Sequence, residues 1–239
     1  MRGDRAINKI LMLKDNNSGP LLEIMALAKE KGVMVQKVEK QGLNKFTKET
    51  AHQGVIALVS PKAYATVEEI LKAIPDGEVP FLILLDEISD PHNLGAILRS
   101  ADAAGAHGVI IPRRRSAPLT PTVAKASAGA IEYVPVARVA NIAQTIDALK
   151  KHGLWLVGAE PAGGDLLWEA RLDGPIALVI GGEDKGLGRL VKDKCDLLVS
   201  LPMYGRVNSL NASVAAALVS YEVARQRKEV LGHDGLSHR

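Results

Sequence analysis

Short apolar runs alternate with amphipathic segments from Phe81 onward, and this alternation is the feature that most restricts the fold. Runs of this length, rich in Val, Ile and Leu, are typical of strands buried on both faces of a parallel sheet. We therefore predict an α/β fold, with a mainly parallel sheet and helices on both of its faces. The expected strands are residues 81–85, 108–111, 154–157, 176–180 and 196–201, and the expected helices begin near Asn93 and cover residues 120–128, 142–151 and 209–227.

The first 60 residues predict a separate, smaller α/β unit. Strands are expected at residues 7–13, 33–38 and 54–59. Between the first two, an apolar stripe with helical spacing precedes Gly32, a residue type that commonly ends helices; the stripe is Leu21, Leu22, Met25 and Ala28. Residues 61–79 contain one short helical pattern beside a polar stretch, and we predict a linker there. The expected domains are therefore residues 1–60 and 80–239.

The composition of the 239-residue chain excludes several classes of protein. Cys195 is the single cysteine, so neither a disulfide framework nor a multi-cysteine metal site can form. The six histidines are scattered without ligand spacing, and we expect no metal. No apolar run reaches the roughly 18–20 residues of a membrane helix, and the N-terminal residues lack a signal-peptide pattern. We therefore expect a cytoplasmic protein. Aromatic residues make up only 3% of the chain, which argues against a base-stacking surface.

Positive charge is concentrated in two segments, although the formal net charge is only +3. Residues 1–62 hold 11 Lys and Arg against 6 Asp and Glu, and six of these lysines lie within residues 29–48. Residues 109–125 contain Arg113, Arg114, Arg115 and Lys125 and no acidic residue. Each cluster taken alone is typical of a solvated surface. Two clusters in different segments could instead bridge one polyanion.

In an open parallel sheet, ligands bind beyond the carboxyl ends of the strands, and three loops there are unusual. The first is DEISDPHNLGAILRSAD, residues 86–102. Asn93 is expected to cap the helix, and Arg99 lies off the apolar face formed by Leu94, Ile97, Leu98 and Ala101. Because helical side chains tilt toward the N-terminus, Arg99 could reach a pocket at this loop. Alternatively, Asn93 is only a cap and Arg99 pairs with Asp102.

The second loop is GGEDKGLG, residues 181–188, directly after a strong strand. Four glycines in eight residues let a backbone approach a ligand closely. The spacing fits neither the dinucleotide-binding fingerprint nor the phosphate loop. Two interpretations of this loop therefore remain: it binds a nucleotide-like ligand, or it is only a tight strand-to-helix turn.

The third loop is LPMYGRVNSLNASV, residues 201–214, which leads into the last helix. Ser209 is expected to be its N-cap, and Asn211 and Ser213 bring polar groups to its first turn. The residues expected to face the core are Leu210, Val214, Leu218 and Tyr221. Capping alone is the alternative interpretation.

Together the three loops resemble the three signature motifs of the SpoU (TrmH) family of RNA ribose 2′-O-methyltransferases. The matching segments are DPHNLGAILRSADAAG, LVIGGEDKGLG and LPMYGRVNSLNASVAAAL. HQGVIALV, residues 52–59, resembles part of the RNA-binding domain of members that methylate a guanosine ribose of 23S rRNA. In those members a short helix precedes the first strand, whereas only six residues precede Ile7 here. The resemblance implies a SPOUT-type C-terminal trefoil knot, S-adenosylmethionine as the cofactor, and a homodimer.

The resemblance also assigns roles to individual residues. The family's catalytic positions fall on Asn93, Arg99, Glu183, Ser209 and Asn211, and its cofactor contacts, made largely by backbone, fall on Gly181, Leu201 and Leu210. Asp184 and Tyr204 depart from the family pattern, in which a glycine and a small residue are usual.

A role for Arg99 follows from its chemistry. A guanidinium stays protonated in proteins, so we expect Arg99 to stabilise a developing alkoxide and a neighbouring phosphate. We expect Arg113 and Arg114 to contact RNA phosphates, with the lysines of residues 29–48 extending that footprint. A tRNA ribose 2′-O-methyltransferase of the same family and a non-catalytic RNA-binding module are the alternatives.

Overall fold

The computed structural model describes residues 5–14, 16, 18–46, 52–161, 163–182 and 186–231. Glu183 and Asp184 lie outside the described residues, as does Lys48. The chain divides into two compact units, residues 1–62 and residues 63–239.

The smaller unit is a three-stranded sheet with two helices. Its elements are β1 (Ile7–Leu13), α1 (Gly19–Glu30), β2 (Val35–Val38), α2 (Lys40–Asn44) and β3 (Val55–Val59). The strand order is β2-β1-β3, with β1 parallel to β2 and antiparallel to β3. Leu21 and Ala28 of α1 are buried, together with Ile10 and Met12 of the central strand. Gly32, at φ +65°, follows α1 as expected. The predicted strands and first helix are thus confirmed, whereas α2 was not predicted.

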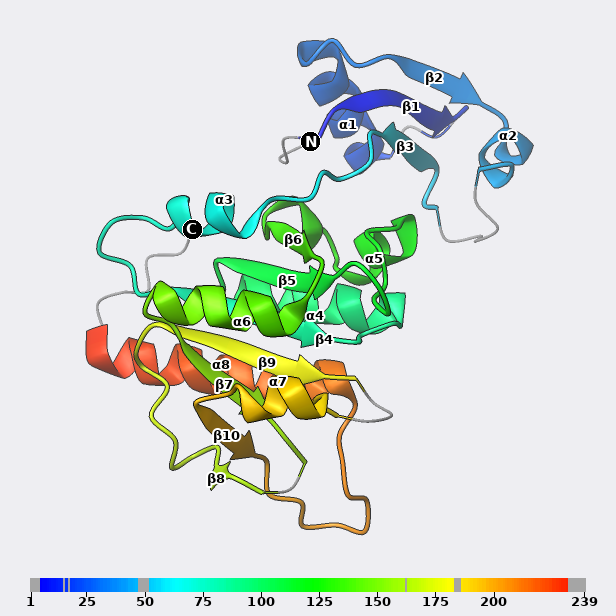
Figure 1. Cartoon of the computed structure of the whole chain (residues 1–239). Coiled ribbons are helices and arrows are strands. Elements are labelled where there is room, and N and C mark those ends of the chain that lie inside the picture. Colours follow the sequence, from blue (N-terminus) through cyan, green and yellow to red (C-terminus); the bar gives the residue numbers. More distant parts are fainter. Residues whose placement is uncertain are drawn as a thin grey trace. The chain divides into compact units, whose positions relative to one another are not determined.

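The larger unit is built on a seven-stranded parallel sheet (Figure 1). Its strands are β4 (Phe81–Asp86), β5 (Gly108–Pro112), β6 (Val136–Val139), β7 (Trp155–Ala159), β8 (Asp165–Leu166), β9 (Ile176–Gly181) and β10 (Leu197–Ser200). Its helices are α3 (Val67–Lys72), α4 (Pro91–Ala103), α5 (Pro121–Ala126), the 3₁₀ turn η1 (Ala130–Glu132), α6 (Ile142–Lys151), α7 (Arg189–Asp193) and α8 (Ala212–Leu231). The order is β6-β5-β4-β9-β7-β10-β8, and every pairing is parallel. The predicted α/β class is confirmed.

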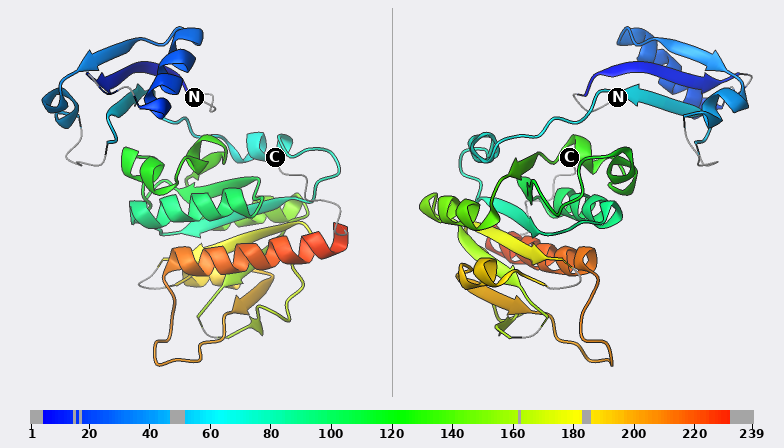
Figure 2. Two further views of the ribbon diagram at one scale, coloured as in Figure 1. Left: turned by 180° about the vertical axis from the view of Figure 1, so that it is seen from behind. Right: turned by 45° about the vertical axis from the view of Figure 1, so that its right-hand side comes forward.

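Alternate residues of each central strand enter two different apolar clusters. Phe81 and Ile83 of β4 pack with α4 and α8, whereas Leu82 and Leu84 pack with α6 and α7. Figures 1 and 2 show these two helix layers on opposite faces of the sheet. Because both faces are covered, all six residues of β4 are buried, which is why its sequence is continuously apolar until Asp86.

Part of the predicted linker packs on the large sheet. Residues from 63 onward belong to the larger unit. The amide of Ala65 donates to the carbonyl of Val136 at 2.9 Å, and Ile70 of α3 is buried among the residues of the second cluster. Thr66 and Glu69 form a capping box that starts α3. A single buried isoleucine in a polar segment therefore anchors residues that we had expected to connect two domains.

Two expected helix caps are wrong. Asp90, not Asn93, caps α4, because its carboxylate accepts from the amides of His92 and Asn93 at 3.1 and 3.3 Å. Likewise α8 begins at Ala212, and the side chain of Asn211, not Ser209, accepts from the first-turn amides. Asp, Asn and Ser are all preferred at the N-cap position. The sequence therefore allows both Asp90 and Asn93 as the cap of α4, and both Ser209 and Asn211 as the cap of α8.

The predicted core face of α8 is also wrong. Val214, Leu218 and Tyr221 are 46%, 41% and 55% exposed. The helix instead buries its smaller residues against the sheet, which are Ala212, Ala216, Val219 and Val223. Small residues let the helix lie close to the sheet, and both faces of this helix are apolar enough to pack. Among the described residues, no helix is long and apolar enough to cross a membrane.

The last strand is inserted between two earlier ones. β10 lies between β7 and β8, which are joined by residues 160–164, so this connection has to cross β10. Gly164 marks the crossing, because a Cβ atom there would lie 2.3 Å from the carbonyl oxygen of Leu198. The trefoil knot implied by the resemblance stays a prediction.

The crossing predicts a large difference between two neighbouring glycines. Gly163 and Gly164 have φ of +89° and +84°, yet only Gly164 faces a backbone atom within 4 Å. Both alanine variants carry the strain of a positive φ. We expect Gly164→Ala to lower the free energy of unfolding by about 1–3 kcal/mol more than Gly163→Ala, because the added methyl overpacks the crossing. Equilibrium urea unfolding at one protein concentration measures this, and equal losses would contradict the crossing.

Candidate functional site

A pocket lies at the carboxyl edge of the large sheet, where β7, β9 and β10 end. Its empty volume, including open solvent at the mouth, is about 660 Å³. The ends of these three strands, the loops after them and the first two turns of α8 supply the lining residues, which are Ala159, Glu160, Pro161, Ile180, Gly181, Gly182, Gly186, Val199, Leu201, Met203, Asn208, Ser209, Leu210, Ala212, Ala215 and Val219. Segments far apart in the sequence therefore form one site.

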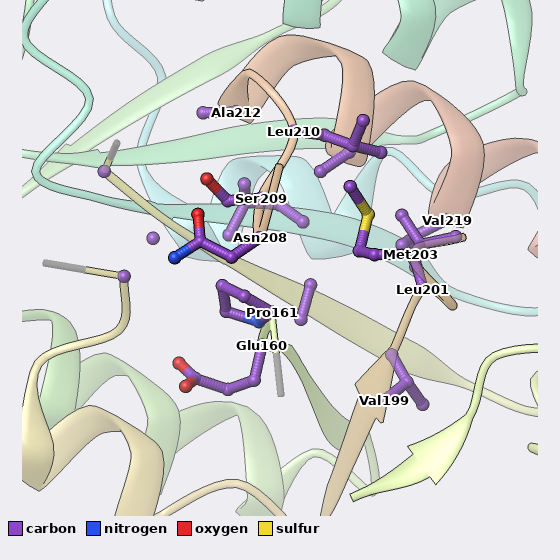
Figure 3. A pocket seen from close by; sticks show the side chains of 16 residues that line it. Glu160, Pro161, Val199, Leu201, Met203, Asn208, Ser209, Leu210, Ala212 and Val219 are labelled. Atoms are coloured by element: carbon purple, nitrogen blue, oxygen red, sulfur yellow. The ribbon is translucent and has the colours of Figure 1, made fainter. Parts of the chain in front are cut away.

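The two sides of the pocket differ in chemistry. Leu201, Met203 and Leu210 gather on one side, as Figure 3 shows, and form an apolar wall. Asn208 and Ser209 lie on the other side, near Pro161. An apolar wall facing a few polar groups is typical of a small-molecule site. Such a pocket suits a ligand that carries a flat apolar ring and a polar chain.

The glycines of the second motif form a tightly closed hairpin. The amide of Gly186 donates to the carbonyl of Gly182 at 2.9 Å. A Cβ atom on Gly181 would lie 2.2 Å from the carbonyl carbon of Gly186, and one on Gly182 would lie 2.8 Å from the carbonyl oxygen of Glu87. No other residue type fits these two positions without moving the backbone. Glu183, which follows Gly182 in the sequence, lies outside the described residues.

A direct hydrogen bond joins the first and third motifs. The side-chain amide of Asn211 donates to the side-chain oxygen of Asn93 at 3.0 Å, and Asn93 is buried. The same Asn211 side chain caps α8, so one residue fixes the start of α8 and its position against α4. Gly95 lets α4 pack closely on α5, since a Cβ atom there would lie 2.4 Å from that of Ala126.

The structure brings some of the predicted site residues together and not others. Gly181, Leu201, Leu210 and Ser209 line the pocket, and Asn93 contacts Asn211 beside it. Arg99 is exposed on α4 and is not among the lining residues. Within the described part of the chain it forms no ion pair, with Asp102 or any other residue, so the pairing alternative fails. The functional roles assigned to these residues stay predictions.

Two carboxylates at this edge were missed by the sequence analysis. Asp86 ends β4, and its buried carboxylate accepts from the amide of Gly188 at 2.9 Å. Burial raises the pKa of Asp86 above its ordinary value, and the hydrogen bond from Gly188 only partly offsets this. Glu160 directly follows β7 and lines the pocket. Both carboxylates lie where a buried strand ends. The sequence analysis searched this position for unusual loops but not for single acidic residues.

The remaining candidate groups fit structural roles. Cys195 donates to the carbonyl of Val191, and burial raises the pKa of its thiol to about 12, which opposes a nucleophilic role. Among the described residues, no cluster of three His, Cys, Asp or Glu side chains could hold a metal ion.

The arginine triplet is exposed, and its members differ. Arg115 pairs with Glu87 at 2.7 Å. Arg113 lines a second, shallower groove between α3 and α6, and its carbonyl accepts from Arg138 at 2.9 Å. Arg113 and Arg114 form no ion pair within the described residues, so their charges are open to a ligand.

Comparison with family models decides the identity of the fold. A model described as "SpoU rRNA Methylase family" matches residues 80–221, and one described as "RNA 2'-O ribose methyltransferase substrate binding" matches residues 1–65. The chain belongs to the SpoU family. The resemblance inferred from the three motifs is thereby confirmed, and the protein is an RNA methyltransferase of this family.

SpoU relatives cover nearly the whole chain. "Putative TrmH family tRNA/rRNA methyltransferase YacO" of Bacillus subtilis (strain 168) is 48% identical over 231 residues, which are 96% of this chain and 92% of that protein. A TrmH family protein of Staphylococcus haemolyticus (strain JCSC1435) is 50% identical over 225 residues, 94% of this chain and 90% of its own.

Solved SpoU structures share the fold. The methyltransferase AviRb from Streptomyces viridochromogenes, in complex with the cofactor AdoMet, has a TM-score of 0.79 at 28% identity and covers 96% of this chain and 85% of its own. The AdoMet-bound rRNA methyltransferase from Sinorhizobium meliloti has a TM-score of 0.77 at 26% identity and covers 93% and 81%.

Proposed function

We propose that this SpoU methyltransferase transfers the methyl group of S-adenosylmethionine to a ribose 2′-hydroxyl in RNA, with a guanosine of 23S rRNA as the substrate. The observation that carries the proposal is the pocket in which the second and third motifs meet. AviRb and the Sinorhizobium meliloti enzyme were crystallised with the same cofactor, AdoMet, on the same fold.

The lining of the pocket fits S-adenosylmethionine. Leu201 and Leu210 offer apolar surface to a purine ring, and the hairpin at Gly181 brings backbone groups close to a ligand. Asn208 and Ser209 supply polar partners for hydroxyl, amino or carboxylate groups. The cofactor when bound supplies an activated methyl group, so the chain has to provide orientation and stabilise charge at the ribose oxygen.

Arg99 is proposed as the group that stabilises this charge. Its guanidinium remains protonated, so it donates hydrogen bonds to the developing alkoxide and to an adjacent phosphate rather than accepting the proton. Asn93 and Asn211 hold the first turn of α4, the helix that carries Arg99. Glu183, Ser209 and Asn211 orient the ribose in this proposal.

The smaller unit supports rRNA over tRNA as the substrate. A TrmH/SpoU tRNA modifying enzyme from A. aeolicus covers 72% of this chain, close to the share that residues 63–239 occupy. The Sinorhizobium meliloti rRNA methyltransferase covers 93% of this chain, so its match extends into the smaller unit as well. Residues 1–65 match a substrate-binding model, and residues 1–62 carry an excess of five positive charges, 11 against 6. We propose residues 1–60 as the RNA-binding domain, 61–79 as the connection and 80–239 as the catalytic domain.

A homodimer in the cytoplasm completes the proposal. Val214, Leu218 and Tyr221 are spaced along one exposed face of α8, and a second copy of the chain would remove this apolar surface from water. The single cysteine, Cys195, supports a reducing compartment.

Methyl transfer tests the proposed function directly. Incubating the protein with methyl-labelled S-adenosylmethionine and separated rRNA and tRNA fractions is expected to label one guanosine of 23S rRNA. That nucleotide should resist alkaline cleavage on its 3′ side, because the 2′-hydroxyl is blocked. A label on a base, or no label in RNA, would contradict the activity, and a label confined to tRNA would overturn the substrate.

Arg99→Ala is expected to slow single-turnover methyl transfer by about 100- to 1,000-fold, since one charge-stabilising donor is lost. Affinity for S-adenosylmethionine should remain unchanged, and Arg99→Lys should be intermediate. Arg171→Ala is the control, because Arg171 is exposed and pairs with Asp173 just before β9, away from the pocket. A near wild-type rate for Arg99→Ala would remove Arg99 from the catalytic machinery.

The Arg113→Ala/Arg114→Ala double variant is expected to weaken RNA binding and flatten its salt dependence. The slope of log K against log salt should fall by about 1.4–1.8, because each phosphate contact contributes about 0.7–0.9. Arg115→Ala should change the slope less, because Glu87 already neutralises Arg115. Filter binding over a range of salt concentrations measures the slopes, and an unchanged slope in the double variant would exclude these phosphate contacts.

A further inference from the structure

The loop that follows β9 is held from both sides by carboxylates of the neighbouring strands. In the sheet order, β9 lies between β4 and β7. Asp86 ends β4 and Glu160 directly follows β7. Their carboxylates accept from two consecutive backbone amides, those of Gly188 and Leu187, at 2.9 and 3.2 Å. The far end of the glycine hairpin is thus fixed at both flanks.

Glu160 makes a second contact that strengthens this arrangement. Its other oxygen lies 2.9 Å from the ammonium group of Lys192 on α7, and only 12% of the Glu160 side chain is exposed. A shielded, charge-assisted hydrogen bond is stronger than an exposed one. Glu160 therefore joins the loop after β7, the hairpin and α7, and it lines the pocket as well.

Asp86 accepts a hydrogen bond from the amide of Gly188, which has no capping side chain in its own loop. Gly188 is the residue before α7 and has no side chain with which to cap that helix. The buried carboxylate of Asp86 accepts from this amide across 102 positions of sequence. Gly188 itself is exposed, but a hydrogen bond to a charged group contributes about 1.5–3 kcal/mol, so the contact favours one position of the loop.

The hairpin held in this way is part of the pocket wall. Gly181, Gly182 and Gly186 line the pocket, and the hydrogen bond from Gly186 to Gly182 closes the hairpin one residue before Leu187. A shift of Leu187 and Gly188 would therefore move the wall, because the glycines have no side chains that could compensate.

We propose that Glu160 and Asp86 are positioning residues, which act through the amides of Leu187 and Gly188 to hold the glycine hairpin in its cofactor-binding position. This inference rests on the proposed function, because it assigns how that same pocket keeps its shape for S-adenosylmethionine. Neither carboxylate needs to touch the reacting atoms.

The chain contains a matched control at the other end of the same strand. Asp196 accepts from the amide of Leu156 near the start of β7 at 2.9 Å, and its other oxygen lies 2.7 Å from Lys150. This is the same set of partners as for Glu160, one backbone amide and one lysine. Asp196 lies at the edge of the sheet opposite the pocket and its side chain contacts Leu156 and Lys150 rather than the hairpin, so we expect its loss to lower stability without changing the pocket wall.

The test compares full-length wild type with Glu160→Ala, Glu160→Gln, Asp86→Asn and Asp196→Ala. Titration calorimetry gives the Kd for S-adenosylmethionine, and thermal unfolding gives stability. We expect Glu160→Ala to raise Kd by about tenfold, which corresponds to about 1.4 kcal/mol. Glu160→Gln and Asp86→Asn should stay within about threefold, because an amide oxygen still accepts from Leu187 or Gly188. Single-turnover rates at saturating cofactor should change little in all variants.

Asp196→Ala is expected to lose as much stability as Glu160→Ala and to keep the wild-type Kd. An unchanged Kd in Glu160→Ala would overturn the proposal, and so would an equal loss of affinity in Asp196→Ala, since that reports general destabilisation. If Glu160→Ala does not fold, Glu160→Gln provides the test. A tenfold higher Kd in Glu160→Gln would contradict the proposal, because its amide oxygen should still accept from the amide of Leu187. If wild type itself does not bind S-adenosylmethionine, the proposed function fails, which is a distinct result.

Discussion

Side chains are excluded where backbone segments cross at the carboxyl edge of the large sheet, and this constraint shapes the rest of the site. A Cβ atom would meet backbone at 2.2 Å on Gly181, at 2.8 Å on Gly182 and at 2.3 Å on Gly164. These contacts close the loop after β9 on itself, set that loop against Glu87 after β4, and set the segment after β7 against β10. The glycines therefore serve the packing of chain against chain as much as any approach to a ligand.

Polar side chains then hold in place the backbone segments that the glycines allow to come close. The hydrogen bond between Asn211 and Asn93 sets α8 against α4, and Asp86 and Glu160 hold the loop after β9 from its two flanks. These groups lie at the ends of two strands and at the starts of two helices, so the pocket depends on the fold of the whole larger unit. Arg99 is exposed on α4 and does not line the pocket.

Strong local patterns in the sequence predicted most of the large sheet. The continuous apolar runs at β4 and β9 are unambiguous, because both faces of these strands are buried. β6 was missed because its four residues include Arg138 and carry little periodicity, and the two residues of β8 carry none. The buried face of α8 could not be predicted, because both faces of that helix are apolar and only packing against the sheet selects Ala216 over Val214.

Only part of the candidate site could be predicted, because contacts between distant residues leave no local pattern in the sequence. Glycine-rich loops after strands are visible in the sequence, whereas the partner of a single carboxylate is not. Glu160 and Leu187 are 27 positions apart, and Asp86 and Gly188 are 102 apart. The identity of each cap was also ambiguous, since Asp90 and Asn93, or Ser209 and Asn211, satisfy the same local rule.

A crystal structure of the full chain with S-adenosylmethionine tests the central claim most directly, which is that the loops after β7, β9 and β10 form one cofactor site. The account predicts cofactor density between the wall of Leu201 and Leu210 and the backbone of Gly181, with the amides of Leu187 and Gly188 still on Glu160 and Asp86. Cofactor bound elsewhere on the chain would contradict the account.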